Sequence, residues 1–150
     1  MISIFNKNEK ETLINRINQL SESSVAQWGT MNVAQMLAHC NIAFELTYED
    51  KHPIPSKFKQ FILKLLVKPM VVGTKPYAKN GRTAPVFIVA DTKNFEKEKT
   101  RLINYINKTN ELGTSYFEEK DSHSFGKLTS QEWNTMFVKH LDHHLKQFGV

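Results

Sequence analysis

Cysteine and long apolar runs are both scarce in this sequence of 150 residues. Cys40 is the only cysteine, so an internal disulfide is excluded and we expect a reducing, cytoplasmic setting. The longest apolar run covers residues 84–90, whereas a membrane-spanning helix needs about 20 residues. The first residues do not follow the order of a secretory signal peptide. We therefore expect a cytoplasmic protein with no transmembrane segment.

Acidic residues are absent from residues 51–90, where eight lysines and arginines lie. The rest of the chain has 12 basic and 15 acidic side chains, so the net charge of +5 combines a basic insert of +8 with a body of −3. The length and the apolar content of 40% are typical of one globular domain over residues 1–150. Such a chain forms a core without a structural metal, so any metal site would serve function.

Apolar side chains recur at helical spacing in four long segments. We predict helices at about residues 8–20, 32–48, 92–110 and 129–148. Two of them start with a capping-box pattern, Asn32 with Gln35 and Thr129 with Glu132. Gly113 follows the third helix as an expected stop.

The remaining long stretch, between the second and third of these helices, is broken by proline and glycine. A shorter amphipathic helix is predicted at residues 56–66, and Pro69 ends it. We expect residues 85–90 to form an extended segment on the bundle, because no second strand pattern is present to pair with it. The predicted fold is all-α: a four-helix bundle with one extra short helix and a long irregular connection.

Three of the six histidines are predicted to face the interior. At about 100° per residue, His140 and His144 lie on one face of the last helix together with Trp133 and Phe137, and His39 lies on the inner face of the second helix. His143 is predicted to face water. The predicted solvent side of the last helix consists of polar side chains, namely Glu132, Thr135, Lys139, Asp142 and Lys146.

Two interpretations of the inward histidines are open. Three neutral imidazoles, His39 with the His140 and His144 pair, can hold a divalent transition metal and leave a coordination position open for catalysis. Alternatively, buried histidines pair with backbone carbonyls or acidic side chains. Spacing alone does not decide between them, because His-x-x-x-His on a helix is only half of a metal site.

The histidine segments resemble those of a known superfamily. The stretch from Trp28-Gly29 to His39 is similar to the start of the second helix in DinB-like proteins, and residues 140–147 resemble their C-terminal His-x-x-x-His-x-x-Gln signature. Residues 123–149 are more similar still to a bacterial branch of that superfamily. The chain departs from the plainer members in the basic insert and in the loop around His123.

This resemblance implies a four-helix bundle with a three-histidine site for a divalent metal (zinc, nickel, iron or manganese) at His39, His140 and His144. Characterised DinB-like proteins include S-transferases and isomerases that use low-molecular-weight thiols, often as homodimers. The resemblance therefore implies a small-molecule substrate or thiol as partner and a homodimer as the assembly.

Other side chains have weaker claims to a role. His123 is a candidate fourth ligand or acid–base catalyst, or else makes a local capping contact. Cys40 is either a zinc ligand or, as we expect, a core residue. Trp28 and Trp133 could line a substrate pocket, but both are expected in the core. Tyr77 and Arg82 lie in a long loop. They either contact a ligand or are solvated, as most polar loop residues are.

The basic insert, residues 51–90, bears on which partner and which function the protein has. It lacks any recognised nucleic-acid-binding motif, so we do not expect a nucleic-acid partner. Its amphipathic helix can contact a membrane surface, attract an anionic substrate or simply cover one end of the bundle with its apolar side. One hypothesis is a metal-dependent transferase or hydrolase acting with a thiol or a hydrolytic substrate. The alternative is a non-enzymatic, stress-associated binding module that uses the basic helix.

Overall fold

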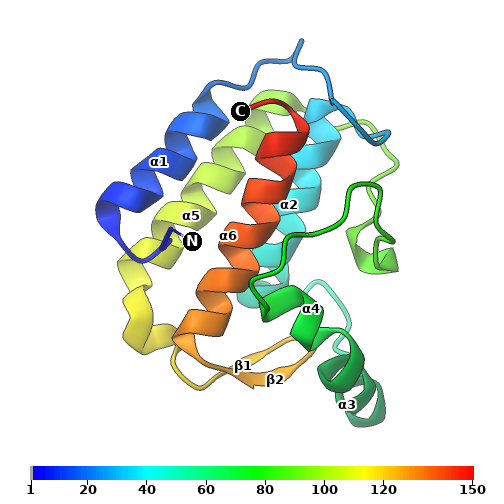
Figure 1. Ribbon diagram of the computed structural model, residues 1–150, viewed down its shortest axis with the longest axis vertical. Helices are drawn as coiled ribbons and strands as arrows, with labels where there is room; N and C mark the ends of the chain where they lie inside the picture. Colours follow the sequence, from blue (N-terminus) through cyan, green and yellow to red (C-terminus); the bar gives the residue numbers. More distant parts are fainter. Residues whose placement is uncertain (1) are drawn as a thin grey trace.

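Four long helices lie side by side along the longest axis of the computed structural model, which describes residues 2–150 (Figure 1). They are α1 (Lys7–Asn18), α2 (Val33–Tyr48), α5 (Phe95–Phe117) and α6 (Ser130–Gln147). In Figure 1, α1 and α6 run in one direction and α2 and α5 in the other, so the long connection between α2 and α5 returns along the bundle. The predicted helical bundle is confirmed.

Side-chain caps start the two helices that hold the inward histidines. The Asn32 side chain accepts a hydrogen bond from the Gln35 N–H, while the Gln35 side chain accepts one from the Asn32 N–H. Thr129 and Glu132 form the same reciprocal pair at the start of α6. These caps satisfy amide groups that have no partner within the helix, so they define where each helix begins.

Aromatic side chains fill the centre of the bundle. Phe137 of α6 stacks on Phe44 of α2 with ring centroids 4.6 Å apart, and its ring lies edge-on to Phe117 of α5. Trp133, one turn earlier on α6, also contacts Phe137. All four side chains are almost completely buried. The predicted inward stripe of α6 therefore packs in the core.

The third long helix extends beyond its predicted end. The backbone leaves helical geometry at Gly113, where φ is 71° and ψ is 176°, and a further helical turn continues to Phe117. That turn places the fully buried Phe117 ring against Phe5 and Trp133. Gly113 thus interrupts the helix as expected. One further helical turn follows it, and the burial of Phe117 in the core holds that turn in place.

The long connection contains more structure than the sequence indicated. It forms α3 (Lys57–Leu66), the short helix α4 (Lys68–Val72) and a 3-10 turn, η1 (Pro85–Phe87). α3 ends at Leu66, before Pro69, as predicted. The helix α4 was not predicted; Pro69 lies in its first turn, where the missing N–H of proline costs nothing. The segment at residues 85–90 lies on the bundle as expected, but as a 3-10 turn against α2.

A small β-hairpin precedes α6, which an all-α prediction did not include. Strands β1 (Lys120–Ser122) and β2 (Gly126–Leu128) pair antiparallel, with Ser122 opposite Gly126. A three-residue loop followed by a glycine with φ of 70° is a common hairpin pattern. Strands of three residues are too short to show alternating hydrophobicity. Only the loop with its following glycine could have indicated a hairpin in the sequence.

One face of α6 that was predicted to be exposed is covered. Thr135 and Lys139 are buried, because α4 and the segment after it pack over them. The Lys139 ammonium donates to the backbone carbonyls of Met70 (2.6 Å) and Gly73 (2.7 Å), near the C-terminal end of α4. Burial lowers the pKa of Lys139. Helical periodicity placed Lys139 on the solvent side of α6. It could not predict that the carbonyls of Met70 and Gly73 would lie there.

Within residues 2–150, no helix is long and apolar enough to cross a bilayer.

Candidate metal centre

The three inward histidines meet between α2 and α6. His39 comes from the middle of α2, and His140 and His144 lie one turn apart on α6. One ring nitrogen from each histidine lies within 4.8 Å of the others. The ring centroids are 4.9 Å apart for His39 and His140, 4.5 Å for His39 and His144, and 4.8 Å for His140 and His144. We call these residues the histidine cluster.

Backbone and side-chain acceptors orient two of the rings. His39 Nδ1 lies 2.8 Å from the Phe87 carbonyl, which can only accept, so Nδ1 carries the proton. His144 Nδ1 lies 2.8 Å from Gln147 Oε1. The Gln147 amide donates through Nε2 to the Trp28 carbonyl at 2.6 Å, which leaves Oε1 as the acceptor for His144. Both histidines therefore present an Nε2 lone pair to the cluster.

The contact between His39 and His140 tests whether a cation fits. Their Nε2 atoms lie 2.9 Å apart, and His39 has only a lone pair to offer there. Two nitrogens bound to a tetrahedral zinc ion at about 2.1 Å lie roughly 3.4 Å apart. This pair would thus accommodate a divalent cation after a shift of a few tenths of an ångström, and a ring nitrogen of His144 lies within 4.8 Å of both partners as the third ligand. The residues present fit such an ion.

The electrostatic surroundings keep the cluster neutral. Burial lowers the pKa of His39, although the Phe87 carbonyl opposes that shift. Burial and the neighbouring histidines hold the pKa of His140 well below its ordinary range, and burial together with His39 lowers the pKa of His144 to about 3. Neutral imidazole is the form that coordinates transition metals, so the cluster needs no deprotonation at neutral pH.

Two supporting residues of the cluster were not identified as candidates from the sequence. Gln147 orients His144, and its spacing was visible in the His-x-x-x-His-x-x-Gln pattern. Gly29 has a φ of 83°, and a Cβ there would lie 2.5 Å from Gln147 Nε2, so glycine allows this close approach. Hydrogen-bond partners of this kind hold metal-binding histidines in one tautomer and orientation.

Phe87 also contributes in a way that helical periodicity could not reveal. Its carbonyl binds His39, and its ring lies 5.4 Å from the His39 ring and 5.6 Å from the His140 ring. η1 therefore covers the histidine cluster. The residue lies in a stretch that follows no helical pattern, so only the folded chain brings it to α2 and α6.

His123 lies outside the histidine cluster. It sits in the loop between β1 and β2, where Nε2 is 3.1 Å from the Pro53 carbonyl and Nδ1 is 3.0 Å from Ser124 Oγ. The Ser124 contact is local, as the alternative role expected, whereas the Pro53 contact joins the hairpin to a segment 70 positions earlier. An acid–base role for His123 stays a prediction.

The remaining candidates divide between the core and the surface. Cys40 is buried and donates to Met36 Sδ, and burial raises the pKa of its thiol. Trp133 is in the core as expected, whereas Trp28 is half-buried and Arg82 is exposed.

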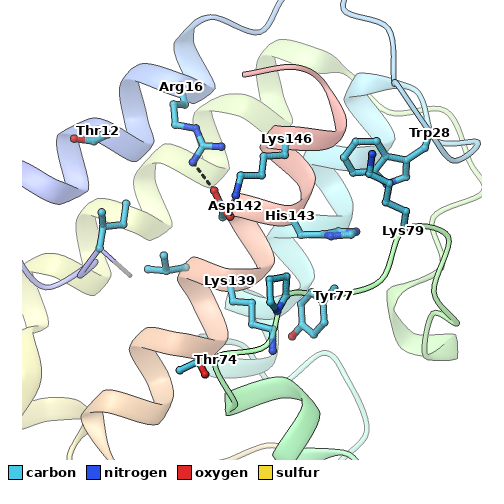
Figure 2. A pocket seen from close by; sticks show the side chains of 13 residues that line it. Thr12, Arg16, Trp28, Thr74, Tyr77, Lys79, Lys139, Asp142, His143 and Lys146 are labelled. Carbon is cyan, nitrogen blue, oxygen red and sulfur yellow. Dashed lines mark hydrogen bonds and ion pairs between the residues drawn. The ribbon is translucent and has the colours of Figure 1, made fainter.

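A separate cavity of about 520 Å³ lies beside α6, and the three clustered histidines do not line it (Figure 2). His143 projects into it between Trp28 and Tyr77, with ring centroids 5.9 Å and 5.7 Å away. His143, which was predicted to face water, is half-buried, because Tyr77 and Trp28 lie against its ring. At the other side of the cavity Arg16 pairs with Asp142 at 3.0 Å (Figure 2).

These observations define a helical-bundle protein with a largely buried cluster of three histidines. Residues 5–149 match the family described as "Protein of unknown function (DUF1569)", and the chain belongs to that family. The match covers nearly the whole chain and includes all three histidines. Comparison with curated proteins and with solved structures gave no match.

Proposed function

We propose that this protein is a metal-dependent enzyme, a transferase or hydrolase, in which His39, His140 and His144 hold a divalent transition metal. The observation that carries the proposal is the convergence of three neutral imidazoles, two of which have Nδ1 tied to an acceptor. The resemblance of the histidine segments to DinB-like proteins supports it and adds a low-molecular-weight thiol as the class of co-substrate.

The chemistry follows from the number of ligands. A divalent metal on three imidazoles supplies a Lewis acid with an open position, at which water or a thiol loses its proton more easily. Phe87 and Gln147 hold His39 and His144 with Nε2 directed inward, and the Phe87 ring limits access of solvent. The excess of positive charge in residues 51–90 attracts an anionic co-substrate.

The metal content of tag-free protein tests the first part of the proposal. Wild type is loaded separately with zinc, nickel, iron(II) or manganese, desalted and measured by elemental analysis. We expect one metal ion per chain with at least one of these metals, and its loss in His140→Ala and in His144→Ala. His143→Ala is the matched control, because His143 lies on the same helix, projects into the separate cavity and should leave the metal content unchanged.

Circular dichroism shows whether each variant remains helical. A metal-free wild type after all four loadings would contradict the proposal. Equal metal loss from a folded His143→Ala variant would also contradict it, because metal binding would then not be specific to the three clustered histidines.

The nature of the co-substrate is tested on protein loaded with cobalt(II). Titration with 2-mercaptoethanol should produce the near-ultraviolet absorption of a thiolate bound to cobalt, and His140→Ala should abolish it. An unchanged spectrum in metal-loaded wild type would rule out the thiol as co-substrate and leave hydrolysis as the reaction class.

A further inference from the structure

The outer face of α3 is apolar and uncovered. Large apolar side chains on it keep between 38% and 76% of their surface exposed, namely Phe58, Phe61, Ile62, Leu65 and Leu66. Of the roles left open for this helix, covering one end of the bundle with these apolar side chains does not agree with their exposure. In Figure 1, α3 lies beyond the lower ends of the four long helices, at one extremity of the molecule.

The orientation of α3 is held by its opposite side. Leu63 and Val67 pack against the hydrophobic core, and Gln60 Nε2 donates to the His123 carbonyl at 3.1 Å. These residues recur at three- and four-residue spacing, so they form one stripe, and the exposed apolar residues lie on the other side of the helix. Rotating α3 to bury Phe58 would expose Leu63 and break the Gln60 contact.

Unpaired lysines border the apolar face on both sides. At about 100° per residue, Lys57 and Lys64 lie along one edge and Lys59 along the other. In the part of the chain that the structure describes, none of the three pairs with a carboxylate, unlike Lys51 with Glu45 and Lys68 with Glu132. Residues 51–90 contain no acidic side chain, so the positive charge around α3 is not neutralised locally.

We propose that α3 docks this protein on an anionic phospholipid surface. Phe58, Phe61 and Leu65 enter the boundary between headgroups and acyl chains, while Lys57, Lys59 and Lys64 contact anionic headgroups. Large apolar side chains flanked by lysines are the features of helices that lie in the membrane interface. The helix needs no change of conformation, because its apolar face already points away from the bundle.

Charge and hydrogen bonding favour lipid over a protein as the occupant. A second copy of the chain placed on this face would bring rows of lysines together, and the basic insert has no acidic residue to pair with them. Specific protein interfaces also carry about one hydrogen bond per 100–200 Å². The apolar side chains of this face provide no donor or acceptor, whereas acyl chains require none.

Vesicle co-sedimentation tests the proposal with the full chain. We expect binding to vesicles of equimolar phosphatidylcholine and phosphatidylglycerol, no binding to phosphatidylcholine alone, and weaker binding as salt rises. Replacing Lys57, Lys59 and Lys64 by glutamate should weaken binding roughly 100-fold or more, since each lysine near an anionic surface contributes measurably. The matched control replaces Lys7, Lys97 and Lys108, which are exposed on α1 and α5, and should weaken binding far less.

The apolar contribution needs its own variant. Phe58→Ser with Phe61→Ser should lower binding roughly tenfold or more, because each phenylalanine loses its apolar burial in the lipid. Both side chains are exposed, so the variant should keep wild-type helicity and thermal stability.

Three results would overturn the proposal. The first is no binding of wild type to anionic vesicles at low salt, and the second is equal loss with the control lysine set. The third is a wild-type dimer in sedimentation equilibrium that Phe58→Ser with Phe61→Ser dissociates, because a second copy would then cover the face.

Discussion

Gln147 connects the histidine cluster to the chain segment before α2. Its Oε1 accepts from His144, and its Nε2 donates to the Trp28 carbonyl, so one amide orients a metal-binding candidate and fixes a loop. Gly29 leaves the space that this amide occupies. The Trp-Gly pair and the terminal glutamine of the His-x-x-x-His-x-x-Gln pattern thus act on the same ring, although they lie at opposite ends of the sequence.

Gln147→Ala is expected to weaken metal binding by roughly 10- to 100-fold, the usual effect of losing a partner that orients a ligand histidine. Competition with a chromogenic chelator measures the affinity. Gln131→Ala, at an exposed position on the same helix, should leave the affinity unchanged. Equal affinities for wild type and Gln147→Ala would show that His144 needs no orientation by Gln147.

At the scale of single residues, the sequence supports the choice of His39, His140 and His144, because helical spacing determines which side chains share a face. Helical spacing could not identify Phe87 as a partner of His39. Its backbone carbonyl contacts His39 from a segment 48 positions away, and no periodicity governs that segment.

Between elements, Glu45 joins α2 to α5 and to the start of the long connection. The carboxylate is 2.5 Å from Arg101 Nη2 and 2.8 Å from both Lys51 Nζ and His52 Nε2. Burial alone would raise the pKa of Glu45, but the hydrogen bonds from Lys51, His52 and Arg101 outweigh it and lower that pKa. The ionised carboxylate therefore stabilises the fold.

Glu45→Gln should lower the free energy of unfolding at pH 7 by about 2 kcal/mol, because Lys51 and Arg101 then face a neutral amide in place of a carboxylate. The contribution is complete above the ordinary glutamate pKa of 4.5 and is lost as pH falls through the lowered pKa of the folded state. Urea unfolding of both proteins should thus show a difference that shrinks below that pH. Glu111→Gln, at an exposed site on α5, is the control, and a difference independent of pH would contradict the argument.

The short elements show how packing overrides pattern. The spacing of apolar residues in the sequence predicted α3. The same spacing does not determine whether the apolar stripe faces the bundle or the solvent. α4 was missed because a proline was treated as a stop, although proline is tolerated in the first turn. Lys139 is buried under α4, where its ammonium donates hydrogen bonds to two backbone carbonyls.

For the whole molecule, a metal on the histidine cluster would join two antiparallel helices, α2 and α6. An ion that binds only the folded chain stabilises it by about 2.7 kcal/mol when its free concentration is one hundred times the dissociation constant. For a chain of this size that corresponds to a rise in Tm of roughly 5–10 °C.

We expect this rise in wild type and in His143→Ala, and none in His140→Ala. Differential scanning calorimetry with and without the metal, and with a chelator to reverse the effect, provides the measurement. An equal rise in His140→Ala would show that the ion binds elsewhere on the folded chain.

The sequence by itself determined the four long helices, their caps and the faces on which the three histidines lie. These features depend on residues a few positions apart, and helical geometry makes their arrangement predictable. Only the tertiary structure decided that η1 covers the histidine cluster, that α4 buries Lys139 and that the apolar face of α3 stays uncovered. Those contacts join segments distant in sequence, and their outcome depends on how the long connection packs along the bundle.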